Sequence, residues 1–183
     1  MGQSLSPRRL GDDFYGQDVL VVAPGLLGKI LCRATPDGVL RARVCEVEAY
    51  RGEADTACHA RAGRTSRTQV MYLAGGHAYV YLCYGIHHML NVVAAEEGNP
   101  QAALIRGVQP LDPQREPIVG PGRLTREYGI TMAENRLDLR VSDTLWFEDD
   151  EYAPPRIETG PRIGIGYASA EDQARPWRYV ARL

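Results

Sequence analysis

The sequence is poor in lysine and has no long apolar run. Lys29 is the only lysine among 183 residues, and it lies far in the sequence from the aromatic cluster described below. Because Schiff-base chemistry uses a lysine amine, the chain offers little for it. The longest apolar runs fall short of the roughly 18 residues that cross a membrane, so we expect no membrane span. The start of the chain lacks the apolar centre of a signal peptide, which predicts a cytoplasmic protein.

Motifs for metals and nucleotide cofactors are also missing. There is no Gly-x-Gly-x-x-Gly segment, no phosphate-binding loop and no helical pair of histidines, so we expect neither a metal nor another cofactor. A metal-dependent hydrolase that uses His59, His77 and His88 is the alternative. The cysteines contain no Cys-x-x-Cys pair, and we expect reduced core thiols. They are Cys32, Cys45, Cys58 and Cys83.

The net charge and the local clusters of charge point to different conclusions about nucleic-acid binding. The formal net charge of −2 argues against a protein that binds nucleic acid through bulk electrostatics. The segment Arg61–Arg67 nevertheless holds three arginines, whereas Glu148–Glu151 is entirely acidic. Arginine matches the geometry of phosphate, although a high arginine content equally reflects genome base composition. A local basic face is therefore compatible with DNA binding but does not establish it.

The pattern of apolar residues predicts an α+β fold. We expect one compact domain over 1–183, with a curved, mostly antiparallel sheet, short helices and a flexible segment over residues 1–10. Alternating residues and turn signals predict the strands. These strands are expected at 29–33, 39–50, 78–83, 88–94, 101–106, 145–147 and 162–165. Short helices are expected at 18–27, 55–59 and 122–128.

One strand carries two carboxylates. In a regular strand Glu46, Glu48 and Tyr50 share one face, and Cys45, Val47 and Ala49 share the other. Glu48 is then either a solvated residue on the sheet face or a partly buried base with a raised pKa. The local pattern alone makes Glu46 an equally good candidate.

Tyrosines are concentrated in the segment 79–84, which holds three of the ten in the chain. Tyr79 and Tyr81 share a strand face. A tyrosine ring is flat and apolar with a polar tip, and such rings stack well on nucleobases. Packing against an edge of the core explains the same pattern equally well.

Several short segments, in order, resemble the alkyladenine (N-methylpurine, 3-methyladenine) DNA glycosylase family. The resemblance extends over nearly the whole chain from about Leu10. The segments are 46–50, His59, Met71, 76–81, 84–85, Asn91, 104–106, 120–124, 161–165 and 177–179.

This resemblance implies a catalytic group. Glu48 matches the family's general base, which activates a water molecule. Arg106 and the backbone carbonyl of Ile163 match the groups that hold this water. The resemblance thus favours Glu48 over Glu46, and it implies a monofunctional hydrolase that leaves an abasic site.

The resemblance also implies a pocket for a flipped-out purine. Tyr50 matches the ring on one face of the base, and His59 and Tyr81 match the residues on the other. The amide of His59 and the region of Ala57 match the groups that face the base edge. Asn91 matches the residue that crowds the amine of normal guanine.

Contacts with DNA are implied around the pocket. Tyr84 matches the side chain inserted into the minor groove, and Ile86 and His87 follow it in a stretch that varies within the family. Arg64 and Arg67 are the expected phosphate contacts. The implied partner is double-stranded DNA containing damaged purines. We expect a monomer associated with the nucleoid of a prokaryote; a nucleic-acid-binding module without catalysis is a further alternative.

Overall fold

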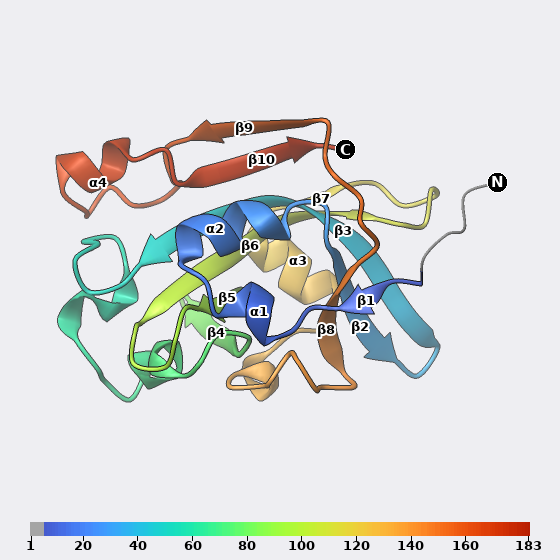
Figure 1. Cartoon of the computed structure of the whole chain (residues 1–183), viewed down its shortest axis with the longest axis horizontal. Coiled ribbons are helices and arrows are strands. Elements are labelled where there is room, and N and C mark those ends of the chain that lie inside the picture. Colours follow the sequence, from blue (N-terminus) through green and yellow to red (C-terminus); the bar gives the residue numbers. More distant parts are fainter. Residues whose placement is uncertain (1–5) are drawn as a thin grey trace.

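The computed structural model describes residues 6–183 and is dominated by one antiparallel sheet (Figure 1). The main path of the sheet runs β1-β8-β2-β3-β6-β5-β4, while β10 joins β3 to β9 and β7 pairs with β6. The predicted α+β class with a mostly antiparallel sheet is confirmed. The strands are β1 (Arg8–Arg9), β2 (Ile30–Thr35), β3 (Gly38–Arg51), β4 (Ala78–Cys83), β5 (His87–Ala94), β6 (Gln101–Pro110), β7 (Ile118–Val119), β8 (Leu145–Asp149), β9 (Arg156–Gly160) and β10 (Arg178–Arg182).

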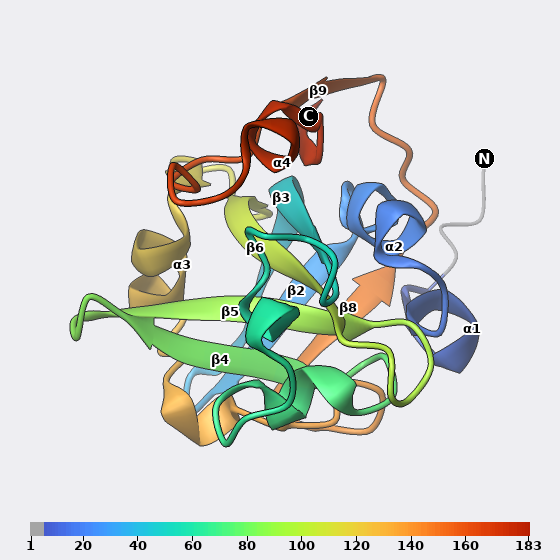
Figure 2. The same ribbon diagram turned by 90° about the vertical axis from the view of Figure 1, so that its left-hand side faces the viewer.

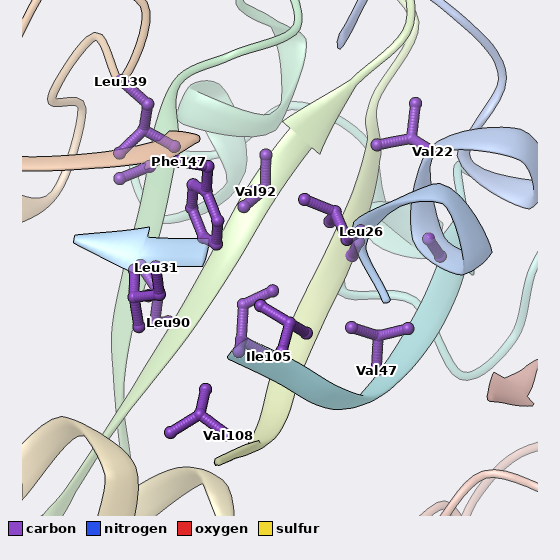
Figure 3. Close-up of a cluster of buried hydrophobic side chains, with 14 of the residues drawn as sticks. Val22, Leu26, Leu31, Val47, Leu90, Val92, Ile105, Val108, Leu139 and Phe147 are labelled. Carbon is purple, nitrogen blue, oxygen red and sulfur yellow. The ribbon is translucent and has the colours of Figure 1, made fainter. Parts of the chain in front are cut away.

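Short helices cover the sheet and close its core. The α-helices are α1 (Asp12–Tyr15), α2 (Val19–Leu26), α3 (Pro121–Glu127) and α4 (Ala170–Ala174), with 3₁₀ turns η1 (His59–Ala62), η2 (Thr68–Tyr72) and η3 (Met132–Glu134). Val22 and Leu26 of α2 point into a cluster that includes Val47 and Ile105 of the central strands (Figure 3). The central strands are thus held from one side by apolar burial.

Strand β3 contains an irregularity that matters for the site. Its register against β6 shifts between Val44 and Glu46 and again before Val47. Val44 lies in the main core together with Val47 and Ala49. Because a bulge adds one residue to the strand, Cys45 is displaced from the core face where regular alternation predicts it. Glu46, Glu48 and Tyr50 all interact on the opposite side, as predicted.

The C-terminal hairpin lies over this strand (Figure 1). Strand β10 is antiparallel to β3, with Arg178 opposite Glu48, and β9 lies outside β10. The loop between β9 and α4 is thereby brought to the end of β3 that carries Glu48.

The hairpin of β4 and β5 projects from the body of the molecule (Figure 2). Its turn contains Tyr84, which has a positive φ of 51°, followed by Gly85 with φ 72°. The tight left-handed turn leaves the side chain of Tyr84 91% exposed. This arrangement places an aromatic ring at the tip of a protruding element.

Two predictions of local secondary structure differ from the structure. Residues 162–165 do not form a strand, because Arg162 and Ile163 direct their hydrogen bonds to side chains and carbonyls of other elements. The expected helix over 55–59 is replaced by turns and η1, since Asp55 binds Arg162.

The segment predicted to be flexible, residues 1–10, is described only in part by the structure. Residues 1–5 lie outside the described chain. Residues 8–9 pair with β8, and Leu10 is buried in the core. Within residues 6–183, no helix combines the length and the apolar character needed to cross a membrane.

Candidate active site

Glu48 is a fully buried carboxylate with hydrogen bonds on both oxygens. Its exposed fraction is 0%. Oε1 accepts a hydrogen bond of 2.7 Å from the backbone N–H of Ile163, and Oε2 accepts one of 2.8 Å from the hydroxyl of Tyr50. Each carboxylate oxygen can accept two hydrogen bonds, so further acceptor capacity is left for a small molecule.

The surroundings of Glu48 shift its proton affinity. Burial raises the pKa of Glu48 above its ordinary value, because removal from water disfavours the charged form. The Arg106 guanidinium, the Ile163 amide and the Tyr50 hydroxyl oppose this rise by stabilising the anion. The site thus holds a carboxylate that is a stronger base than an exposed glutamate.

Glu46 and two arginines form an ion cluster beside Glu48. The Nε of Arg106 is 3.1 Å from Oε1 of Glu46 and 3.5 Å from Oε1 of Glu48. Arg178 of β10 donates to the same Glu46 oxygen at 2.7 Å. Glu46 therefore balances two cations, whereas Glu48 has one distant cation and hydrogen bonds from neutral donors. This difference makes Glu48, of the two carboxylates, the one with the less compensated charge.

Arg162 is a buried cation that contacts several parts of the site. It forms a two-point ion pair with Asp55, at 2.6 and 2.9 Å, and donates to the backbone carbonyl of Ala49 at 2.9 Å. Its guanidinium carbon also lies 4.9 Å from the centre of the Tyr50 ring and 5.0 Å from that of Trp177. One buried cation thus fixes the strand, the pocket ring and the loop that carries Ile163.

A small cavity lined mostly by aromatic side chains lies beside Glu48. The ring of Tyr50 belongs to its wall, and the hydroxyl of the same residue reaches Glu48. Tyr50 therefore links the wall of the cavity to the carboxylate. Its lining consists of Tyr50, Ala57, His59, Met71, Tyr79, Tyr81, Asn91, Ala102 and Tyr167.

The side of the cavity formed by β4 and η1 is neutral. His59 Nδ1 is 3.0 Å from the hydroxyl of Tyr79, and the rings of His59 and Tyr81 have centres 4.5 Å apart. Burial lowers the pKa of His59 to about 4, with Arg67 and Arg61 acting in the same direction. Burial also raises the pKa values of Tyr79 and Tyr81. At neutral pH these rings therefore carry no charge.

Asn91 closes the floor of the cavity. It is 3% exposed, and its amide nitrogen donates to the backbone carbonyls of Tyr79 at 3.1 Å and Met89 at 3.4 Å. These bonds fix the direction of the side-chain amide. Among the base-pocket candidates, Tyr50, Ala57, His59, Tyr81 and Asn91 are thus all brought to one cavity.

The residues predicted to contact DNA lie outside this cavity. Tyr84, Ile86 and His87 occupy the turn and the first residue of β5 at the tip of the hairpin, all exposed. Arg64 and Arg67 are exposed in the segment between η1 and η2. The guanidinium of Arg67 lies 5.1 Å from the centre of the Tyr81 ring, so this arginine is at the edge of the cavity.

The histidines are dispersed. His59 is on the cavity wall, His77 bonds to the carbonyl of Ala74, and His88 lies on β5. Between residues 6 and 183, no three His, Cys, Asp or Glu side chains gather in a way that could hold a metal ion.

Sequence reasoning missed three contributors: Asp55 as an ion-pair partner, Arg162 and Tyr167. Arg162 is 107 residues from Asp55, and the hydroxyl of Tyr167 bonds to the carbonyl of Ala57 across 110 residues. Local patterns cannot report such distant pairs. The available signal was that Arg162 and Tyr167 flank Ile163 within one short segment.

Comparison with known proteins gives a consistent result. Residues 13–182 match the family described as methylpurine-DNA glycosylase (MPG). Three similar proteins each carry the name "Putative 3-methyladenine DNA glycosylase". That of Anaeromyxobacter dehalogenans strain 2CP-1 is 46% identical over 180 residues, covering 95% of this chain and 82% of the relative. For Methanocella arvoryzae the identity is 43% over 180 residues, with 91% and 89% covered. For Borrelia garinii subsp. bavariensis it is 42% over 174 residues, with 92% and 94% covered.

Proposed function

The chain belongs to the methylpurine-DNA glycosylase family, and we propose from this that it removes alkylated or deaminated purines from duplex DNA as a monofunctional hydrolase. Glycosylases of this kind hydrolyse N-glycosyl bonds and act in base-excision repair. The observation that carries the proposal is the buried, hydrogen-bonded Glu48 beside an aromatic cavity.

The base must first leave the DNA stack. Extrusion costs a few kcal/mol, and less for a damaged or mispaired base. In the proposed complex Tyr84, followed by Ile86 and His87, enters the minor groove and fills the vacated position, as intercalating side chains do. Arg64 and Arg67 contact phosphates near the cavity edge.

Tyrosine stacking then offsets the cost of extrusion. Tyr50 on one face of the base, with His59 and Tyr81 on the other, can each contribute; a base–aromatic contact is worth roughly 1–3 kcal/mol. An alkylated purine is cationic, and the rings facing it are uncharged at neutral pH because His59 has its pKa lowered to about 4. Electron-rich rings favour such a cation. Asn91 and the region of Ala57 then restrict which base edges fit.

Bond cleavage follows from the charges around Glu48. As the N-glycosidic bond breaks, its electron pair goes to the base and the sugar develops oxocarbenium character. Anionic Glu48 stabilises that charge and takes a proton from the attacking water, whose oxygen bonds to the sugar carbon. Arg106 and the carbonyl of Ile163 hold this water. General-base assistance of this kind contributes typically about 10²–10⁴-fold.

The same residues favour hydrolysis without strand cleavage. Lys29, the only lysine in the sequence, forms an ion pair of 2.6 Å with Asp149. Asp149 belongs to β8, whereas Glu48 belongs to β3, and β2 lies between these two strands. We therefore propose that no lysine Schiff base forms and that the product is an abasic site. We further propose that the enzyme acts as a monomer in the prokaryotic cytoplasm, at the nucleoid.

The test is release of free base from duplexes that each contain one lesion. The panel holds 3-methyladenine, 7-methylguanine, hypoxanthine and ethenoadenine, and compares the wild type with Glu48→Gln. We expect the wild type to release at least one base, and Glu48→Gln to bind the same duplex while losing excision by at least about 10²-fold. Near-normal excision by Glu48→Gln would remove the assigned role of Glu48.

A further inference from the structure

The enclosed part of the cavity beside Glu48 is smaller than a purine: its volume is about 30 Å³, which is room for about two water molecules. A side chain in its lining must therefore move before a base can be enclosed there. This inference rests on the proposed function, because it concerns how the base reaches Glu48.

The walls differ in their freedom to move. Ala57, Met71, Tyr79, Asn91 and Ala102 are at most 3% exposed, so packing holds them in place. The remaining strand-side walls are tied by named contacts: Tyr50 to Glu48, and His59 to Tyr79. Tyr81 packs between His59 and Tyr79. Among the nine residues that line the cavity, all in the described part of the chain, only Tyr167 is classed as exposed, at 56%.

Tyr167 is held in place by few contacts. Its hydroxyl donates a hydrogen bond of 2.8 Å to the backbone carbonyl of Ala57, and Arg61 lies 5.3 Å from the centre of its ring. Both partners belong to the segment opposite the loop of Tyr167. The hydroxyl therefore bridges two segments that both line the cavity.

The backbone on both sides of Tyr167 is anchored, so a rotation of the side chain alone can open the cavity. Arg162 is fixed by its ion pair with Asp55. Ser169 donates its backbone N–H to Thr56 at 2.9 Å. A side chain with one hydrogen bond between two anchored points can swing outward without unfolding the loop.

We propose that Tyr167 is the gate of the base pocket. In the closed state its hydroxyl is bonded to the Ala57 carbonyl across the opening. An extruded purine enters when that bond breaks and the ring rotates toward solvent. Closure of the gate competes with entry of the base. The strength of the hydrogen bond between Tyr167 and Ala57 therefore contributes to the equilibrium between the stacked and the extruded base.

The experiment measures extrusion separately from cleavage. The duplex carries a lesion nucleotide with fluorine at the 2′ position, which destabilises the oxocarbenium ion and stops hydrolysis. A neighbouring 2-aminopurine brightens when the lesion leaves the stack. We expect Tyr167→Phe to raise the extrusion equilibrium constant about fivefold, the effect of losing one net hydrogen bond in the closed state. Its melting temperature should fall by no more than about 2–4 °C, because the same lost bond costs about 1 kcal/mol of stability.

The matched control is Tyr152→Phe. Tyr152 also has an arginine over its ring, with Arg43 at 4.2 Å from the ring centre, but it does not line the cavity. This variant should leave the extrusion constant unchanged. If Tyr167→Phe leaves extrusion unchanged or weakens it while the wild type releases base, the gate is wrong. If the wild type releases no base from any lesion duplex, the proposed function fails instead.

Discussion

The charged cluster around Glu48 and the aromatic side of the cavity are built from opposite kinds of side chain. The cluster, called the charged wall below, does not line the cavity itself; it consists of Glu46, Glu48, Arg106 and Arg162, which hydrogen-bond across β3, β6 and the loop before α4. The aromatic wall consists of His59, Tyr79 and Tyr81, which contact one another mainly through ring faces and edges.

The difference shows how one fold separates two tasks. Charges in a buried wall need a complete set of partners, so that wall is rigid and its members depend on one another. Neutral rings can stack on a bound ligand as well as on a neighbouring ring, because stacking depends on contact area more than on precisely placed hydrogen-bond donors. Tyr50 joins the walls, since its hydroxyl bonds to Glu48 and its ring packs with the aromatic cluster. We therefore expect changes in the charged wall to affect folding and changes in the aromatic wall to affect binding.

The largest expected effect is on stability, from Arg162→Met. This change leaves Asp55 buried without its cation, and breaking a buried pair costs about 3–5 kcal/mol. Denaturant unfolding would measure the loss. The control is Arg156→Met, which breaks an exposed pair with Glu158 and should cost less than about 0.5 kcal/mol. Equal losses for the two variants would contradict the claim that the buried ion pair of the charged wall stabilises the fold.

A smaller effect, on binding alone, is expected from Tyr81→Ala. Loss of one stacking ring should weaken binding to a lesion duplex by about 1–3 kcal/mol, or roughly 5- to 150-fold. Titration with an uncleavable duplex measures this affinity. Tyr81→Phe keeps the ring and should bind within about twofold of the wild type. A comparable loss in both variants would mean that the hydroxyl, not the ring, makes the contact.

Tyr84→Ala should have a still smaller effect, confined to the extruded state. Tyr84 is exposed, so the free energy of unfolding should change by less than about 0.5 kcal/mol. Without the ring, the extrusion equilibrium should fall about fivefold, near the lower limit for aromatic stacking on a base. The 2-aminopurine signal would report it. Unchanged kinetics on duplex substrate would rule out the wedge.

The smallest effect concerns pH. Burial lowers the pKa of His59 to about 4, below the ordinary 6.5 of the unfolded chain. The unfolded state therefore binds more protons between these values, and this residue reduces stability as pH falls from about 6.5 to about 4. Between pH 8 and 6 the ring stays neutral, and its contribution to binding a cationic base should change less than about twofold. An NMR titration of His59 with a midpoint near 6.5 would contradict this.

Much of the sheet could be predicted because its strands alternate and are separated by turn residues. The pair β2 and β3 is an example: alternation and the segment Pro36–Gly38 predict both strands and their turn. The prediction of a strand at 162–165 is wrong for a physical reason. Its apolar and β-branched residues favour a strand, but the Ile163 amide is committed to the Glu48 carboxylate. The competing bond depends on a partner 115 residues away.

Part of the site could also be predicted from the alternation of residues along a strand. Local alternation placed Glu48 and Tyr50 on one face, but it could not separate Glu48 from Glu46. The structure distinguishes their environments, since Arg106 and Arg178 lie 3.1 and 2.7 Å from Glu46, whereas Arg106 lies 3.5 Å from Glu48. Tyr167 was missed because a single tyrosine between Gly166 and Ala168 carries no periodic signal, and its partner Ala57 has none either.

The bond between Ile163 and Glu48 has a consequence for the nascent chain. The two residues are 115 positions apart, and ribosomes add about 5–20 residues per second, so Glu48 waits roughly 6–23 s for its partner. During that time β3 can pair with β2 while its carboxylate lacks the Ile163 amide and the cover of β10. A chain from which β10 has not yet emerged therefore has no finished active centre. Its ability to act on DNA begins only after the segment through Arg182 has emerged and β10 has docked.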